Sequence, residues 1–194
     1  MGIEYERKYK ATFQALDQME QTLGQNATQI RMETTYYDTP DGSFSARHWT
    51  VRRRRENEKS VCTFKFPVDA IGRGEFEVES PSLEAAISEL CKLSGKEELA
   101  LLAKDGLVPV CGARFTRTAV AITVGSTLVE LALDRGILLG GGKEIPLSEA
   151  EVELKAGDPK DVDRFGAYLQ ANFDLQPEQF SKFARAKALA QGEI

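Results

Sequence analysis

The sequence predicts an α+β fold that is mainly antiparallel β, with helices packed against the strands. Several segments alternate charged and apolar residues, which is typical of strands with one polar and one apolar face. The segments between them carry apolar residues at helical spacing and begin at serine, aspartate or proline. Such strands can form an open sheet with its charges in solvent, or a closed barrel that turns the charges inward.

Charged groups recur in phase along the predicted strands. Near the N-terminus, Glu4, Glu6 and Lys8 share one face. Two acids on a rigid backbone can hold a hard cation, and a lysine beside them can contact the phosphate that this cation carries. The same alternation recurs at Glu75, Glu77 and Glu79, at Glu149, Glu151 and Glu153, and at Glu130 and Asp134. The alternative is that these charges form only the solvated face of an amphipathic sheet.

The elements of the first half follow from local pattern. The first strand ends near Lys10, and apolar residues at helical spacing then predict a helix over 13–23. The composition of residues 38–42 predicts a turn. Four more strands are predicted at 31–37, 49–55, 60–67 and 73–79. On these strands Arg52 and Arg54 share a face, and Lys65 is a further basic residue.

The second half repeats this mixture of strands and helices. Pro81 and Ser82 open a predicted helix, and a short helix follows over 97–104. Strands are then predicted at 113–124, which contains Arg117, and at 127–138 and 145–155, with a glycine turn at 140–142. Asp158 opens another helix, and a final helix follows Pro177. These helices are expected to cover the apolar face of the strands.

Composition narrows the class of protein. The 194 residues and the net charge of −5 suit one folded domain, 1–194, and a phosphate ligand then requires locally gathered basic residues. The three cysteines lack metal-ligand spacing and predict free, buried thiols, so any metal is expected to be held by oxygen. No apolar run approaches membrane-spanning length and no signal-peptide core is recognisable, which predicts a cytoplasmic protein. The basic run 52–55 lacks interleaved aromatics, which argues against nucleic-acid binding.

A set of motifs is distributed over almost the whole chain. The motifs are Glu4-x-Glu6-x-Lys8, Tyr37-Asp38-Thr39-Pro40, Val51-Arg52-Arg53-Arg54, Phe64-Lys65, Glu75-Phe76-Glu77, Glu130 with Leu133-Asp134, Glu151-Val152-Glu153-Leu154 and Ser181-Lys182-Phe183-Ala184-Arg185-Ala186. Together and in this order they resemble those of one known family, the CYTH superfamily, also called triphosphate tunnel metalloenzymes. The resemblance implies an eight-stranded closed antiparallel barrel, the triphosphate tunnel, flanked by helices.

The resemblance also implies roles for individual residues. Mg²⁺ or Mn²⁺ would be bound by Glu4, Glu6, Glu130, Glu151 and Glu153. Phosphate oxygens would be bound by Lys8, Arg52, Arg54, Lys65, Arg117, Lys182 and Arg185. Lys8 and Glu130 are the expected catalytic residues, Lys8 near the phosphorus under attack and Glu130 as a group that activates or positions the attacking water. Glu75, Glu77 and Glu149 are expected either to hold the basic side chains in place or to contact the metal.

The implied activity is metal-dependent hydrolysis of a triphosphate, with inorganic triphosphate favoured because no aromatic platform for a base or for thiamine is recognisable. Adenylate cyclisation and the hydrolysis of thiamine triphosphate or nucleoside triphosphates are the enzymatic alternatives. A polyphosphate- or nucleotide-binding module without activity is the alternative from another class, although such a module would not need the acidic residues. The expected partner is the small-molecule triphosphate, and neither a membrane nor an obligate protein partner is expected.

Overall fold

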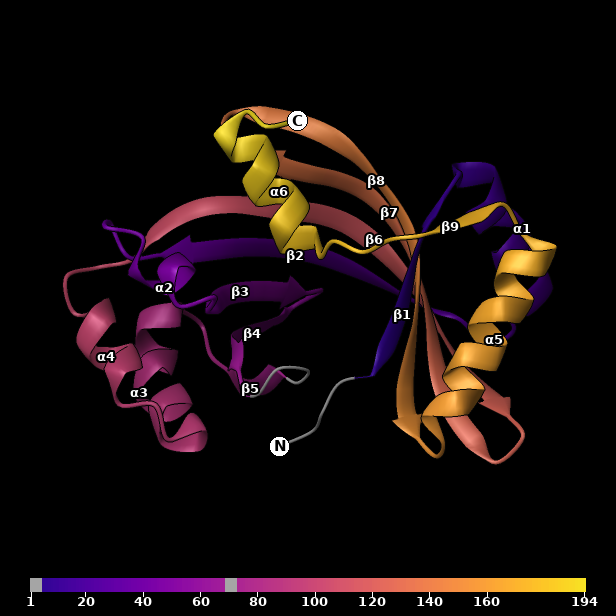
Figure 1. Ribbon diagram of the computed structural model, residues 1–194, viewed down its shortest axis with the longest axis horizontal. Helices are drawn as coiled ribbons and strands as arrows, with labels where there is room; N and C mark the ends of the chain where they lie inside the picture. Colours follow the sequence, from indigo (N-terminus) through magenta and orange to yellow (C-terminus); the bar gives the residue numbers. More distant parts are fainter. Residues whose placement is uncertain (1–4, 69–72) are drawn as a thin grey trace.

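The protein forms a strongly curved antiparallel sheet with helices packed on both of its faces (Figure 1). The computed structural model describes residues 5–68 and 73–194. The strands are β1 (Glu6–Ala11), β2 (Thr28–Asp38), β3 (Thr50–Glu56), β4 (Lys59–Pro67), β5 (Arg73–Glu79), β6 (Val108–Val124), β7 (Thr127–Gly140), β8 (Lys143–Ala156) and β9 (Leu175–Pro177). The helices are α1 (Phe13–Leu23), α2 (Ser43–Ala46), α3 (Leu83–Ser94), α4 (Glu98–Ala103), α5 (Pro159–Asn172) and α6 (Lys182–Gln191).

The closed eight-stranded barrel is not observed. The hydrogen-bonded order in the described part of the chain is β5-β4-β3-β2-β6-β7-β8-β1-β9, so β5 and β9 are the edges of an open nine-stranded sheet. Closure would require the outer edge of β1 to pair with β5. Part of that edge is already used, because β9 pairs with β1 at Tyr9–Ala11 and the Glu178 N–H donates to the Lys8 carbonyl at 2.8 Å. The α+β class with antiparallel pairing is confirmed.

The outer, convex face of the sheet is apolar and is covered by helices at both ends (Figure 1). At one end α1 and α5 pack on β7 and β8, where Leu131, Leu133 and Val152 are fully buried. At the other end α3 packs on β4 and β5 around Phe64. The apolar residues of each strand alternate with the charged ones, so burying this face leaves the charged residues on the opposite, inner face.

The inner face also has an apolar part, and α6 packs on it. Ala186 of α6 is buried against Leu138 and Leu147, and Phe183 meets the Tyr36 ring at a centroid distance of 4.9 Å. Gly140 permits this close approach, because a Cβ at that position would lie 2.4 Å from the Ala186 carbonyl oxygen. The N-terminal end of α6 is thereby held next to the charged part of the inner face.

Most of the predicted elements are present. The glycine turn is a two-residue hairpin in which Gly141 and Gly142 have φ of 57° and 75°, values that suit a type I′ turn. β9 and the short helix α2 were not predicted, because each spans too few residues to show a periodic pattern. All three cysteines are free, as predicted, but Cys91 is only half-buried. No helix among the described residues is both long and apolar enough to cross a membrane.

We expect Gly140→Ala to displace α6 and lower the free energy of unfolding by about 1–3 kcal/mol, the usual cost of overpacking. The added methyl group would overlap the backbone of Ala186 and Ala190. Urea unfolding measures the loss, and hydrogen exchange should show faster exchange of the α6 amides. The matched control is Gly142→Ala, which has no atom within 4 Å and should cost only the strain of its positive φ. Equal hydrogen-exchange rates of the α6 amides in the two variants would contradict the role of Gly140 in the close packing of α6.

Candidate functional site

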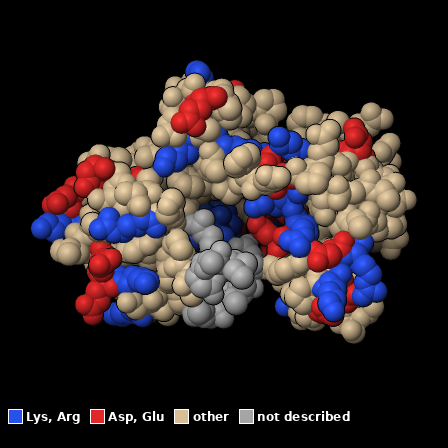
Figure 2. All heavy atoms as spheres, viewed as in Figure 1, with Lys and Arg blue, Asp and Glu red and all other residues tan. Residues whose placement is uncertain are grey.

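The inner face gathers charges of both signs in the hollow of the curved sheet (Figure 2). Arg52 lies on this face, where its Nε donates to Thr63 Oγ1 at 3.2 Å, and Arg54 lies beside Glu56. Arg53 lies on the other face, where its Nε donates to Ser60 Oγ at 2.9 Å, and Arg55 is exposed. The prediction that Arg52 and Arg54 share a face, opposite to Arg53, is therefore confirmed.

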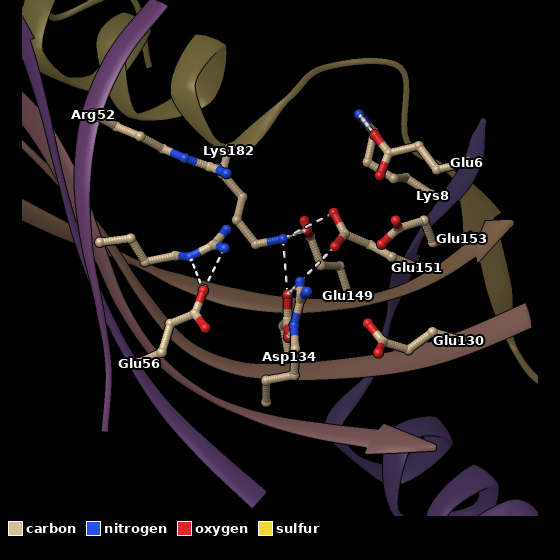
Figure 3. Close-up of polar contacts among 12 residues, drawn as sticks. Glu6, Lys8, Arg52, Glu56, Glu130, Asp134, Glu149, Glu151, Glu153 and Lys182 are labelled. Atoms are coloured by element: carbon tan, nitrogen blue, oxygen red, sulfur yellow. Dashed lines mark hydrogen bonds and ion pairs between the residues drawn. The ribbon is translucent and has the colours of Figure 1, made fainter. Parts of the chain in front are cut away.

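Three acidic residues form a row across neighbouring strands. In the strand pairing Glu6 of β1 lies opposite Glu153 of β8, and Glu153 lies opposite Glu130 of β7. Glu6, Glu153 and Glu130 are called the acidic row below, and Figure 3 shows them on one side of the site with Arg52 across from them. Glu4, predicted to act with them, lies outside the described residues.

The acidic row offers the type of ligand that divalent cations prefer. Carboxylate oxygens are preferred ligands of Mg²⁺ and Mn²⁺, and Mg²⁺ usually keeps several of its waters. The side chains of Glu130 and Glu153 are each 30% exposed, which leaves room for such waters. Two ammonium groups already contact the row: Lys155 Nζ lies 2.8 Å from Glu153 Oε2 and 3.6 Å from Glu130 Oε1, and Lys8 Nζ lies 3.0 Å from Glu6 Oε1.

A second group of acids is buried deeper and holds cations of the protein itself. One oxygen each of Asp134, Glu149 and Glu151 lies within 4.8 Å of the others. Lys182 extends from α6 into this group, with its Nζ 2.8 Å from Asp134 Oδ2 and 3.0 Å from Glu151 Oε1 and in close contact with Glu149 (Figure 3). We call these four residues, together with Arg117, the buried ion network.

Arg117 completes the buried ion network from β6. Its Nε and Nη2 donate to the two Asp134 oxygens at 2.8 and 2.7 Å, and Nη2 also donates to Glu151 Oε2 at 2.6 Å. Bidentate pairs of this kind are the strong ones among charged hydrogen bonds. Both oxygens of Glu151 thus contact protein cations, so its predicted role as a metal ligand stays a prediction.

The two glutamates of the network differ in pKa. Burial raises the pKa of Glu149, and its neighbour Glu151 adds to this, although Lys182 and Arg185 act in the opposite direction. Burial alone would also raise the pKa of Glu151, but Lys182 and Arg117 outweigh it and hold that pKa well below its usual range. Asp134 and Glu151 outweigh burial at Arg117 and raise its pKa well above its usual value. Glu151 and Arg117 are therefore firmly charged.

The opposite wall carries the predicted phosphate-binding residues of β3 and β4. Lys65 Nζ lies 2.8 Å from Glu75 Oε2, and Arg52 Nη2 lies 3.4 Å from Glu75 Oε1. Glu77 lies 3.5 Å from Arg52 and 3.8 Å from Arg54. The glutamates of β5 thus hold the basic side chains in place, which is one of the two roles predicted for them. We call Arg52, Arg54 and Lys65 the basic wall.

Two further predicted residues lie at the edges of the site. Lys8 Nζ is 3.0 Å from Glu6 Oε1, so it borders the acidic row. Arg185 turns toward β8 and β9, where it contacts Glu149 and lies 3.4 Å from Glu178 Oε2. A groove of about 560 Å³ along the edge of β1 has Glu6 and Lys8 in its lining. The Glu6 end of the acidic row therefore borders this groove.

Asp134, Lys155 and Glu56 were not on the predicted list of site residues. The sequence contained a signal for each, because each continues a predicted strand in the correct phase. Asp134 lies four residues beyond Glu130, Lys155 two beyond Glu153, and Glu56 two beyond Arg54. The strand alternation therefore placed them on the inner face, but it could not show which cation would meet which carboxylate.

The CYTH domain matches residues 2–186, which is most of the chain. The chain belongs to the CYTH domain family. This agrees with an inner face on which acidic and basic strands oppose each other, and it confirms the resemblance seen in the sequence.

The chain is also similar to individual proteins of known sequence or structure. The inorganic triphosphatase of Haemophilus influenzae (strain ATCC 51907 / DSM 11121 / KW20 / Rd) is 28% identical over 196 residues, which is 100% of this chain and 53% of that protein. The chain thus spans about half the length of this relative. The PH1819 protein from Pyrococcus horikoshii OT3 has a TM-score of 0.64 at 21% identity, with 98% and 99% of the two chains covered. A putative adenylyl cyclase from Hippeastrum, described as having a dominant triphosphatase activity, has a TM-score of 0.64 at 17% identity, with 100% and 96% covered.

The buried ion network predicts different costs for two glutamates on one strand. Glu151→Gln should lower the free energy of unfolding by about 3–5 kcal/mol at pH 7, because it removes the buried carboxylate that contacts both Arg117 and Lys182 and so leaves the network with excess positive charge. The lowered pKa of Glu151 means that its stabilisation is present above the unfolded-state pKa and is lost as the pH falls through the folded-state pKa. The difference in the free energy of unfolding between Glu151→Gln and the wild type should therefore become smaller below about pH 4.3.

The matched control for this prediction is Glu149→Gln, two residues away on β8. Its raised pKa means that burial disfavours the charged carboxylate in the folded state, so that the stability it contributes falls as the pH rises. At pH 7 the amide should therefore lower the free energy of unfolding less at position 149 than at position 151. Urea unfolding at a series of pH values measures both variants. Equal losses at pH 7, or a Glu151→Gln loss that persists unchanged into acid, would contradict this account.

Proposed function

We propose that the chain is a divalent-metal-dependent triphosphatase that hydrolyses inorganic triphosphate to pyrophosphate and phosphate. The observation that carries the proposal is the opposition, across one hollow, of the acidic row and the basic wall. Membership in the CYTH family and the similarity to an inorganic triphosphatase support it. We propose Mg²⁺ or Mn²⁺ as the metal and Glu6, Glu130 and Glu153 as ligands within the described part of the chain.

The cation, when bound, would neutralise phosphoryl oxygens and thereby admit a water to an otherwise anionic centre. The protein's own residues bind and orient the substrate. The basic wall supplies guanidinium and ammonium donors for phosphate oxygens along the chain, and Arg117 and Lys182 supply donors from the floor of the hollow. Lys8 lies beside the acidic row and would donate to oxygens of the phosphoryl group under attack. Glu130 lies in the same row and is the group that would position the attacking water.

Inorganic triphosphate is the favoured substrate because the apolar part of the inner face is already filled. The Tyr36 and Phe115 side chains are 4% and 8% exposed and are covered by α6 or by cations of the network, so among the described residues they offer no open platform for a base or for thiamine. The remaining inner face is charged and suits a compact chain of phosphates. An attached organic group would have to lie outside it.

The direct test measures phosphate release from inorganic triphosphate, thiamine triphosphate, ATP and pyrophosphate, with and without Mg²⁺ or Mn²⁺. We expect metal-dependent release that is highest with inorganic triphosphate. Glu153→Gln should lower the rate at least about a hundredfold, because an amide keeps the shape of a metal ligand without its charge. The matched control is Glu144→Gln, an exposed position on the same strand, which should retain the wild-type rate. Cyclic AMP formed from ATP as the main product would replace the proposal with adenylate cyclisation.

Kinetics should separate Lys8 from Arg52. If the Lys8 ammonium contacts oxygens whose charge grows in the transition state, Lys8→Ala should lower kcat by about two to three decades with little change in KM. Arg52→Ala should act mainly on KM, because Arg52 lies on the far wall and would hold the rest of the chain equally in the ground and transition states. Steady-state rates on inorganic triphosphate at saturating Mg²⁺ measure both. A Lys8→Ala enzyme with normal kcat would remove Lys8 from the catalytic residues.

A further inference from the structure

Lys155 contacts two carboxylates of the acidic row, the proposed metal site. It is near the end of β8, two residues beyond Glu153, and its side chain lies on the inner face. Its ammonium is within 2.8 Å of Glu153 and 3.6 Å of Glu130, and these two carboxylates face each other across neighbouring strands. Its side chain is 37% exposed, so it reaches the row from the solvent side.

We propose that Lys155 is an internal counter-ion that competes with the divalent cation for Glu130 and Glu153, and so sets the metal affinity of the acidic row. The inference rests on the proposed function, because it takes the acidic row as the metal site. It adds a residue to which the motif comparison gave no role, and it predicts that removing this residue strengthens metal binding.

The competition follows from the positions of the atoms. A Mg²⁺ ion binds carboxylate oxygens at about 2.0–2.1 Å, and it would use the same lone pairs that the ammonium uses. An ammonium and a divalent cation about 4 Å apart also repel each other, by about 2 kcal/mol in water and more beside the protein. Lys155 therefore has to withdraw when a metal enters.

The surroundings of Lys155 allow such a withdrawal. A lysine carries a compact charge on a flexible stem, and a partly exposed ammonium can return to water at little cost. Lys182 is the contrast, because its side chain is 11% exposed and its ammonium contacts Asp134, Glu149 and Glu151. Lys155 is thus the exchangeable cation, whereas Lys182 is held in place by the buried ion network.

The test is a titration of the whole chain with Mn²⁺ alone, followed by the loss of the free Mn²⁺ paramagnetic resonance signal at constant ionic strength. We expect Lys155→Met to bind Mn²⁺ about tenfold more tightly than the wild type, as removal of one nearby positive charge predicts. Lys155→Arg keeps the charge and should stay within about twofold of the wild type. Lys143→Met, at the exposed opposite end of β8, is the matched control and should leave the affinity unchanged.

A further variant identifies the site that the titration reports. Glu153→Gln in the Lys155→Met background should abolish the gain, because it removes a carboxylate for which the two cations compete. A merely structural role of Lys155 would weaken Mn²⁺ binding on substitution, or leave it unchanged, and would not strengthen it. Unchanged or weaker binding by Lys155→Met overturns the proposal, as does a gain that persists in the Glu153→Gln background.

The proposed function can fail separately from this inference. Wild-type protein that releases no phosphate from any triphosphate, while Lys155→Met still gains Mn²⁺ affinity, would retain the counter-ion and discard the triphosphatase. If the wild-type protein hydrolyses inorganic triphosphate with Mg²⁺ but Lys155→Met binds Mn²⁺ no better than the wild type, the triphosphatase is retained and the counter-ion role of Lys155 is discarded.

Discussion

Charge compensation on the inner face is the constraint on which the rest of this structure depends. Strand alternation places carboxylates and cations on one face, and the curvature of the sheet brings them within a few ångströms of each other. A buried carboxylate without a partner would cost several kcal/mol. In the described structure the buried ones are matched: Asp134 and Glu151 contact Arg117 and Lys182, and Glu149 contacts Lys182 and Arg185. The sheet can therefore fold around a strongly charged hollow before any ligand binds.

Helix α6 links the apolar and charged parts of that hollow. Its apolar side packs on Leu138, Leu147 and Tyr36, and its first turn delivers Lys182 to the buried ion network. Lys187 adds a contact to Ser45, whose hydroxyl donates in turn to the buried Asp38 carboxylate. The helix thus contacts β2 and α2 on one side and the β6–β8 strands on the other. The position of Lys182 depends on packing interactions well outside the charged site.

The sequence predicted the faces of the strands better than it predicted how the sheet ends. A period of two is a local property, so it correctly assigned Arg52 and Arg54 to one face and Arg53 to the other. The open edge was not predictable in the same way, because it depends on β9, a three-residue strand that follows α5 and pairs with β1. The sequence also could not predict which charged residues would pair with each other. Lys182 and Asp134 are far apart in sequence, and only the packing of α6 brings them together.

The pairing on the inner face also constrains how ligands can bind under the proposed function. A triphosphate that took Arg117 or Lys182 away from the buried ion network would leave Asp134 and Glu151 with one cation in place of two, at a cost in stability. A divalent cation that entered the acidic row alone would add positive charge beside Lys8 and Lys155. When both ligands bind, the phosphate oxygens offset the added positive charge and the metal offsets the charge of the carboxylates. The ion pairs that stabilise the empty hollow therefore favour joint binding of metal and triphosphate over binding of either one alone.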